Sequence, residues 1–175
     1  MEINKEELFP VEIYTVRTNV DTHPFIEYID SIKKEFYYRK EAGGYQGGID
    51  VDDYLFKDIK ELIDTSIQQT FNTSHELLEI WGSILTPGDY NKIHNHPALN
   101  PTYYSSELYA GILYLKTNNI GTLTIHSNTN VTDSRNILVE DGDLVFMKSY
   151  VYHSVIPNES PDDRICIAFN FKLNT

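Results

Sequence analysis

Two histidines, two residues apart, stand near the end of the stretch Gly88-Asp89-Tyr90-Asn91-Lys92-Ile93-His94-Asn95-His96-Pro97. Alternate residues of an extended strand point to the same face and lie about 7 Å apart along the backbone. Pro97 has no backbone N–H and ends such a strand, so the pair is placed at a strand end. This position favours two ligands of one metal ion over the alternative of two surface residues.

A third histidine and an arginine follow in later predicted strands. His153 comes after an apolar strand and is the natural third ligand, although alone it would also fit a hydrogen-bonded core residue. A guanidinium on a small, polar strand face is costly unless it pairs with an anion, and a carboxylate is its bidentate match. A salt bridge within the protein is the alternative. The face in question carries Arg164, Cys166, Ala168 and Asn170.

Composition limits the classes to which the protein can belong. The 175 residues suffice for one domain with a hydrophobic core. The net charge of −12, without a basic patch, argues against nucleic acid as a partner. The single cysteine precludes an internal disulfide, no apolar run is long enough to span a membrane, and the charged N-terminus does not resemble a signal peptide. We therefore expect a cytoplasmic protein that binds neither nucleic acid nor membrane.

Hydrophobic spacing predicts two helices in the first part of the chain. Apolar residues recur at helical intervals over 22–38, where Asp21 or Thr22 can cap the start, and again over 50–71. Four glycines between these segments, within 42–48, predict a loop. The segment 1–75 is thus expected to be a mainly helical support.

After Ser74 the hydrophobic period changes to that of strands. Eight short strands with turn residues between them predict a jelly-roll barrel that carries the site. The fold class expected is α+β, one domain over 1–175, with the barrel over 76–175. The predicted strands are 76–86, 92–96, 107–117, 121–127, 136–139, 143–148, 152–156 and 164–172.

The order and spacing of several short elements resemble the 2-oxoglutarate- and Fe(II)-dependent oxygenases, in particular small proteins of this kind in marine bacteria and their phages. The resemblance implies a double-stranded β-helix and a dioxygenase with Fe(II) as its metal and 2-oxoglutarate as co-substrate. If the gene is phage-borne, the protein would act in the host cytoplasm. The elements are Trp81, His94-Asn95-His96-Pro97, 110–115, 141–146, 153–158 and 164–170, with 8–10 and 43–46 near the N-terminus.

The family pattern is HxD or HxE, then a distal histidine, then Arg-x-Ser. By resemblance, His94 and His153 bind iron and Arg164 binds the far carboxylate of 2-oxoglutarate. Two residues depart from the pattern, because Cys166 takes the place of the serine and His96 that of the carboxylate ligand. Three neutral imidazoles leave the site one charge more positive, and zinc or nickel would also suit it. The residues expected to bind the metal are His94, His96 and His153, and those expected to bind the co-substrate are Arg164, Cys166, Tyr114 and Asn170.

Two other classes stay open. Gly88 and the HxH pair also fit a cupin-type three-histidine metalloprotein, a 2-oxoglutarate-independent dioxygenase or isomerase, in which Glu107 is the nearest candidate for a fourth ligand. A barrel that binds or supports a partner without catalysis is the other. The substrate, a small molecule or a peptide, is not readable, nor is the oligomeric state. Residues 98–106, with Tyr103 and Tyr104, and the glycine segment 43–48 are the expected rim of its site.

Overall fold

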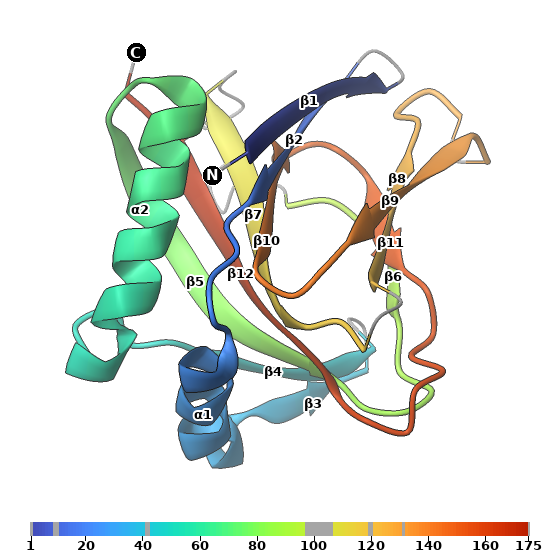
Figure 1. Cartoon of the computed structure of the whole chain (residues 1–175). Coiled ribbons are helices and arrows are strands. Elements are labelled where there is room, and N and C mark those ends of the chain that lie inside the picture. Colours follow the sequence, from blue (N-terminus) through green and yellow to red (C-terminus); the bar gives the residue numbers. More distant parts are fainter. Residues whose placement is uncertain are drawn as a thin grey trace.

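Twelve strands and two helices make up the part of the chain that the computed structural model describes, residues 2–8, 11–40, 43–96, 107–118, 121–130 and 132–174 (Figure 1). The helices are α1 (His23–Ile32) and α2 (Lys57–Phe71), with 3₁₀ turns at Lys33–Glu35 and Tyr54–Phe56. The strands are β1 (Glu2–Leu8), β2 (Val11–Arg17), β3 (Tyr37–Arg39), β4 (Gly44–Gly48), β5 (His75–Leu85), β6 (Asn91–His94), β7 (Leu108–Lys116), β8 (Gly121–His126), β9 (Ser134–Val139), β10 (Asp143–Lys148), β11 (His153–Val155) and β12 (Arg164–Leu173).

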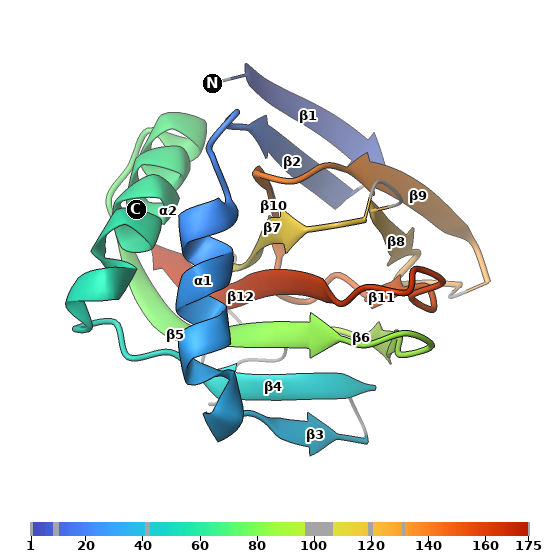
Figure 2. The ribbon, with the colours of Figure 1, turned by 60° about the horizontal axis from the view of Figure 1, so that its bottom comes forward.

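The strands form two antiparallel sheets that face each other. The larger has the order β1-β2-β10-β7-β12-β5-β4-β3 and the smaller the order β6-β11-β8-β9. Both helices lie on one side of the larger sheet, and the smaller sheet lies on the other side (Figure 2). All eight strands predicted after Ser74 are present, and the predicted double-stranded β-helix is confirmed.

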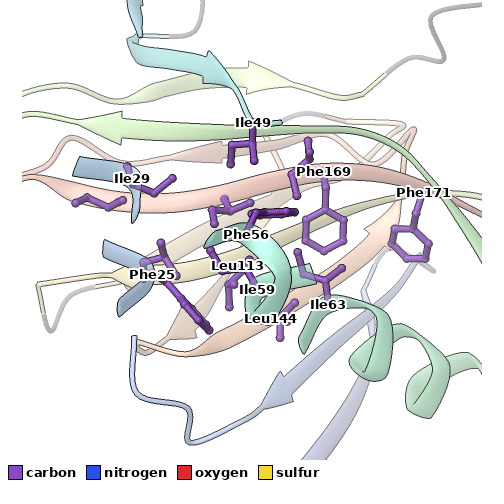
Figure 3. Packing of buried hydrophobic residues seen from close by; sticks show 14 of the residues in the cluster. Phe25, Ile29, Ile49, Phe56, Ile59, Ile63, Leu113, Leu144, Phe169 and Phe171 are labelled. Atoms are coloured by element: carbon purple, nitrogen blue, oxygen red, sulfur yellow. The ribbon is translucent and has the colours of Figure 1, made fainter. Parts of the chain in front are cut away.

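Two hydrophobic cores hold these layers together. The core between helices and sheet is built from side chains of α1, α2 and the outward face of β12 and β7, and Figure 3 shows Phe56, Ile59 and Ile63 pointing toward Leu113 and Phe169. The core between the sheets is smaller and holds fully buried side chains such as Leu123 and Ile125. This core includes neither His94 at the end of β6 nor Arg164 at the start of β12, two polar residues that line one pocket.

The N-terminal segment 1–75 carries the two expected helices, but the expectation that it is mainly helical omits four strands. Helix 22–38 ends at Ile32, and after one 3₁₀ turn the chain joins the larger sheet as β3. The predicted glycine loop contains β4, which pairs with β5 and β3. The glycines admit close packing, since a Cβ at Gly47 would lie 2.1 Å from the ring of Phe36.

β1 and β2 are two further strands that we did not expect. β2 pairs with β10 over five residues and alternates buried and partly buried side chains, so the N-terminus becomes part of the barrel. β1 is rich in charged residues and pairs only with β2, along its full length. Among the described residues, no helix combines the length and apolar character needed to cross a membrane.

Candidate metal centre and co-substrate pocket

Three histidines converge where β6 ends and β11 begins. His94 and His153 lie directly opposite each other in the ladder between these two strands. His96 follows β6, and its backbone N–H donates to the carbonyl of Ser149 at 2.8 Å, which keeps the chain close to the same strand end. The ring centroids are 4.3 Å apart for His94 and His153, 5.0 Å for His96 and His153 and 5.5 Å for His94 and His96. Potential donor atoms of all three rings lie within 4.8 Å of one another.

A carboxylate ligand is not part of this cluster within the described residues. Asp89, the acidic residue nearest in sequence to the pair, accepts hydrogen bonds from the backbone and hydroxyl of Thr86 and from the hydroxyl of Tyr38. Its carboxylate therefore holds the turn before β6. Glu107, the candidate fourth ligand of a cupin-type site, is also outside the cluster.

Hydrogen bonds hold each ring in the same tautomer. The Nδ1 atoms of His94 and His153 lie 2.7 Å and 3.0 Å from the carbonyl oxygens of Lys92 and Val151, respectively. A carbonyl oxygen can only accept, so each Nδ1 carries the hydrogen and each Nε2 keeps its lone pair. His96 has a side-chain partner instead, the Oδ1 of Asn170 at 2.8 Å. An imidazole that donates through Nδ1 presents Nε2 to a metal in a fixed orientation.

Burial keeps the three rings neutral. Burial lowers the pKa of His94. Burial, and to a smaller extent electrostatic repulsion from the His94 ring, lowers the pKa of His96 to about 4. Burial also lowers the pKa of His153 well below 6.5, with further contributions from the other two histidines. Neutral imidazole is the form that binds metal ions, so the cluster is a suitable donor set near neutral pH.

A pocket extends from the histidines to Arg164. Its lining includes the three histidines together with Tyr114, Arg164 and Cys166, so the structure brings together six of the seven predicted site residues. Cys166 lies opposite Tyr114 in the ladder of β12 and β7. Arg164 is 5% exposed, and its Nη1 donates to the carbonyl oxygen of Ile156 at 3.4 Å.

Tyr114 and Cys166 are protonated donors in this pocket. The hydroxyl of Tyr114 is buried and has no hydrogen-bond partner among the described residues. Burial raises the pKa of Tyr114 well above 10, and it raises the pKa of Cys166 to about 11. An unpaired buried hydroxyl beside a guanidinium is costly unless a ligand accepts its hydrogen bond. These groups therefore fit a bound carboxylate.

Asn170 is the predicted site residue that does not lie in this pocket. It shares a strand face with Arg164, but six residue steps along the strand separate the two by about 20 Å, too far for both to contact one small co-substrate. Asn170 instead contacts His96, and its Nδ2 donates to Oε2 of Glu79 at 3.0 Å.

An outer cleft of about 600 Å³ opens beside the histidines. Trp81, whose ring centroid lies 5.4 Å from that of His96, is at the junction of the cleft and the inner pocket. Gln46, Gly47 and Gly48, from the expected rim segment 43–48, line this cleft. Sequence reasoning missed Glu79, although the alternation of 79, 81 and 83 on one face of β5 was a usable signal. Tyr103 and Tyr104 lie outside the described residues. The cleft is lined by Tyr37, Arg39, Gln46, Glu79, Trp81 and Asn95, among others.

Comparison with known proteins adds to this geometry. The family model described as "Putative 2OG-Fe(II) oxygenase" matches residues 79–170, more than half of the chain. A search of curated proteins found no match.

Several solved structures share the fold at low sequence identity. A prolyl-4-hydroxylase from Pseudomonas putida is 14% identical with a TM-score of 0.65, over 93% of each chain. The viral collagen prolyl hydroxylase vCPH from Paramecium Bursaria Chlorella virus-1, solved with 2-oxoglutarate, is 13% identical with a TM-score of 0.67, over 91% of this chain and 95% of that one. HygX from Streptomyces hygroscopicus, solved with nickel, 2-oxoglutarate and hygromycin B, is 12% identical with a TM-score of 0.64, over 91% and 82%. By its family match and its fold, the chain belongs to the 2-oxoglutarate- and Fe(II)-dependent oxygenases.

Proposed function

We propose that His94, His96 and His153 hold Fe(II) through their Nε2 atoms, and that Arg164 and Tyr114 bind the far carboxylate of 2-oxoglutarate. The observation that carries the proposal is the pocket, which has three neutral imidazoles at one end and a buried guanidinium with an unpartnered hydroxyl at the other. A dicarboxylate has one anionic group for each end. Fe(II) and 2-oxoglutarate, when bound, supply the oxidation of a substrate C–H bond by O₂, with succinate and CO₂ as the other products.

The residues of the chain bind and orient these groups. Arg164 offers a planar pair of donors that matches a carboxylate, and its burial strengthens the interaction. Cys166 replaces a hydroxyl donor with a weaker thiol donor, while Tyr114 adds a hydroxyl. Ile112 and Ala168 line the same pocket and add apolar surface to it. The reaction class that we infer is hydroxylation.

The substrate would approach through the outer cleft. This cleft reaches His94 and His96 from the side of β3 and β4, whereas the co-substrate pocket lies toward Arg164. The cleft is open and mixed in character, with the aromatic rings of Tyr37 and Trp81 beside the charges of Arg39 and Glu79. HygX has been solved with hygromycin B bound, and vCPH is described as a collagen prolyl hydroxylase. We infer a small-molecule or peptide substrate for this chain as well.

The test is an anaerobic titration of the protein with Fe(II) and then with 2-oxoglutarate. We expect one metal per chain, and 2-oxoglutarate binding only when metal is present. His153→Ala should lose the metal, whereas His23→Ala should retain it because His23 is an exposed residue of α1. Metal binding without 2-oxoglutarate binding would refute the co-substrate assignment and favour a cupin-type metalloprotein. No metal binding at all would favour a non-catalytic barrel.

A further inference from the structure

We propose that Glu79 and Asn170 form a positioning relay for His96, the histidine that stands where the family has a carboxylate ligand. The inference rests on the proposed metal site. The relay has two hydrogen bonds in series. Nδ1 of His96 lies 2.8 Å from Oδ1 of Asn170, and Nδ2 of Asn170 lies 3.0 Å from Oε2 of Glu79.

Strand pairing places the members of the relay. Asn170 of β12 lies directly opposite Glu79 of β5 in the ladder between these strands, so their side chains share the face toward the smaller sheet. The pairing of the two strands shifts immediately after Asn170. Trp81, two residues along β5 from Glu79, packs against the ring of His96. The relay and Trp81 thus hold the His96 ring.

The chemistry of Glu79 sets the direction of both hydrogen bonds. An ionised carboxylate only accepts, so the NH₂ group of Asn170 must face Glu79. The amide oxygen of Asn170 must then face His96, and this oxygen also only accepts. Nδ1 of His96 therefore carries the hydrogen, and Nε2 keeps the lone pair that a metal needs. Without a fixed acceptor at position 79, the amide could turn round and favour the opposite tautomer.

His96 needs this support more than the other two histidines. His94 and His153 belong to paired strands and donate to backbone carbonyls two residues earlier in the chain. His96 lies beyond the end of β6, and its ring is held by side chains. The relay also puts one negative charge two hydrogen bonds from the metal site, in a cluster that has no carboxylate ligand within the described residues. Such charge raises the basicity of a histidine ligand.

The experiment compares Glu79→Gln, Asn170→Leu and the double variant Glu79→Gln/Asn170→Asp with the wild type. In the double variant, the carboxylate introduced at position 170 would accept from His96, and the amide introduced at position 79 would donate to that carboxylate. Both the hydrogen-bond direction and the charge are thereby restored. Glu76→Gln is the matched control, because Glu76 is an exposed residue of the same strand. Thermal unfolding of each apo-protein verifies the fold.

Two readouts are measured, and neither needs turnover. The first is the ¹⁵N NMR spectrum of the His96 ring in the apo-protein, which reports the tautomer directly. The second is the affinity and visible spectrum of Co(II), used as an oxygen-stable probe of the metal site. We expect the wild type, Glu76→Gln and the double variant to have the Nδ1–H tautomer and Co(II) affinities within about threefold. Loss of an outer-shell partner typically costs 10–100-fold in metal affinity, so we expect a loss of about tenfold for Glu79→Gln and more for Asn170→Leu.

The outcomes separate this inference from the proposed function. An unchanged tautomer and an unchanged Co(II) affinity in Glu79→Gln would overturn the relay, as would a double variant no better than the single ones. If the wild type binds no Co(II), the proposed metal site is refuted, and the NMR readout still decides whether Glu79 and Asn170 orient His96.

Discussion

Replacing Arg164 with alanine should abolish most of the binding of 2-oxoglutarate while leaving the metal in place. Arg164 is 5% exposed and lines the pocket at the end away from the histidines, so its charge is the one that would meet the far carboxylate. Removal of one partner from a buried charge pair costs roughly 3–5 kcal/mol. At about 1.4 kcal/mol per tenfold, the affinity should fall by two or more orders of magnitude.

A graded series sharpens this prediction. Arg164→Lys should recover part of the lost affinity, because lysine keeps the charge but not the two parallel donors. Tyr114→Phe should cost less than Arg164→Ala, about 10–100-fold, since it removes one hydrogen bond to a charged group worth about 1.5–3 kcal/mol. Arg39→Ala is the matched control, because Arg39 lines the outer cleft but not the co-substrate pocket.

The assay is calorimetric titration of the anaerobic Fe(II) protein with 2-oxoglutarate, with metal content measured on the same samples. Burial lowers the pKa of Arg164, yet a guanidinium stays charged at neutral pH, so the titration is read at pH 7 without correction. Equal affinities for the wild type and Arg164→Ala, or an equal loss in Arg39→Ala, would refute the assignment of Arg164 to the co-substrate.

Three further predictions follow from other parts of the structure. His153→Ala should lower the metal content to near zero in elemental analysis, because His153 lies opposite His94 at the centre of the cluster; wild-type content would contradict this. His96→Asp should retain Fe(II) but bind 2-oxoglutarate about tenfold more weakly, because it adds a negative charge beside a dianion; calorimetry showing tighter binding would contradict the charge argument. Burial raises the pKa of the Asp64 carboxyl, but hydrogen bonds from Lys60 and His75 outweigh this effect and hold the pKa below 3.8. The ionised carboxylate therefore stabilises the fold above pH 3.8, and this stabilisation is lost as the pH falls through the lower pKa of the folded state. Asp64→Asn should therefore cost about 0.5–1 kcal/mol at pH 7 in thermal unfolding and less near pH 2, and equal losses at both pH values would contradict it.

The barrel could be predicted from sequence because each of its strands carries its own signal. β12, for example, alternates an apolar face with a small, polar one, and turn residues separate the strands. The N-terminal strands lack such a signal. β1 is rich in charge and forms through seven residue pairs with β2, and β4 contains glycines that serve close packing against Phe36. In both cases strand pairing overrides local propensity: β1 pairs with the next strand along the chain, and β4 pairs with the more distant β5.

The site was predictable where it depends on spacing and not where it depends on register. The HxH pattern places His94 and His96 together, and the order of the strands makes His153 the third member. Sequence does not show that residue 153 stands opposite residue 94 or that Asn170 stands opposite Glu79, because strand register is a property of the assembled sheet. Sequence therefore did not indicate that Asn170 lies beside His96 and outside the pocket that Arg164 lines.

In the proposed site, the two departures from the family pattern would act in opposite directions on the co-substrate. His96 in place of a carboxylate would remove a negative charge beside the metal and so strengthen the attraction for one end of a dianion. Cys166 stands in place of a serine at the other end, where a thiol is the weaker donor, so in the proposed site Tyr114 and Arg164 would hold that carboxylate. Binding would thus depend more on the metal end than in a site with two histidines and one carboxylate. The proposed relay would return part of the missing negative charge through Glu79, two hydrogen bonds from His96, while the metal would stay coordinated by neutral imidazoles.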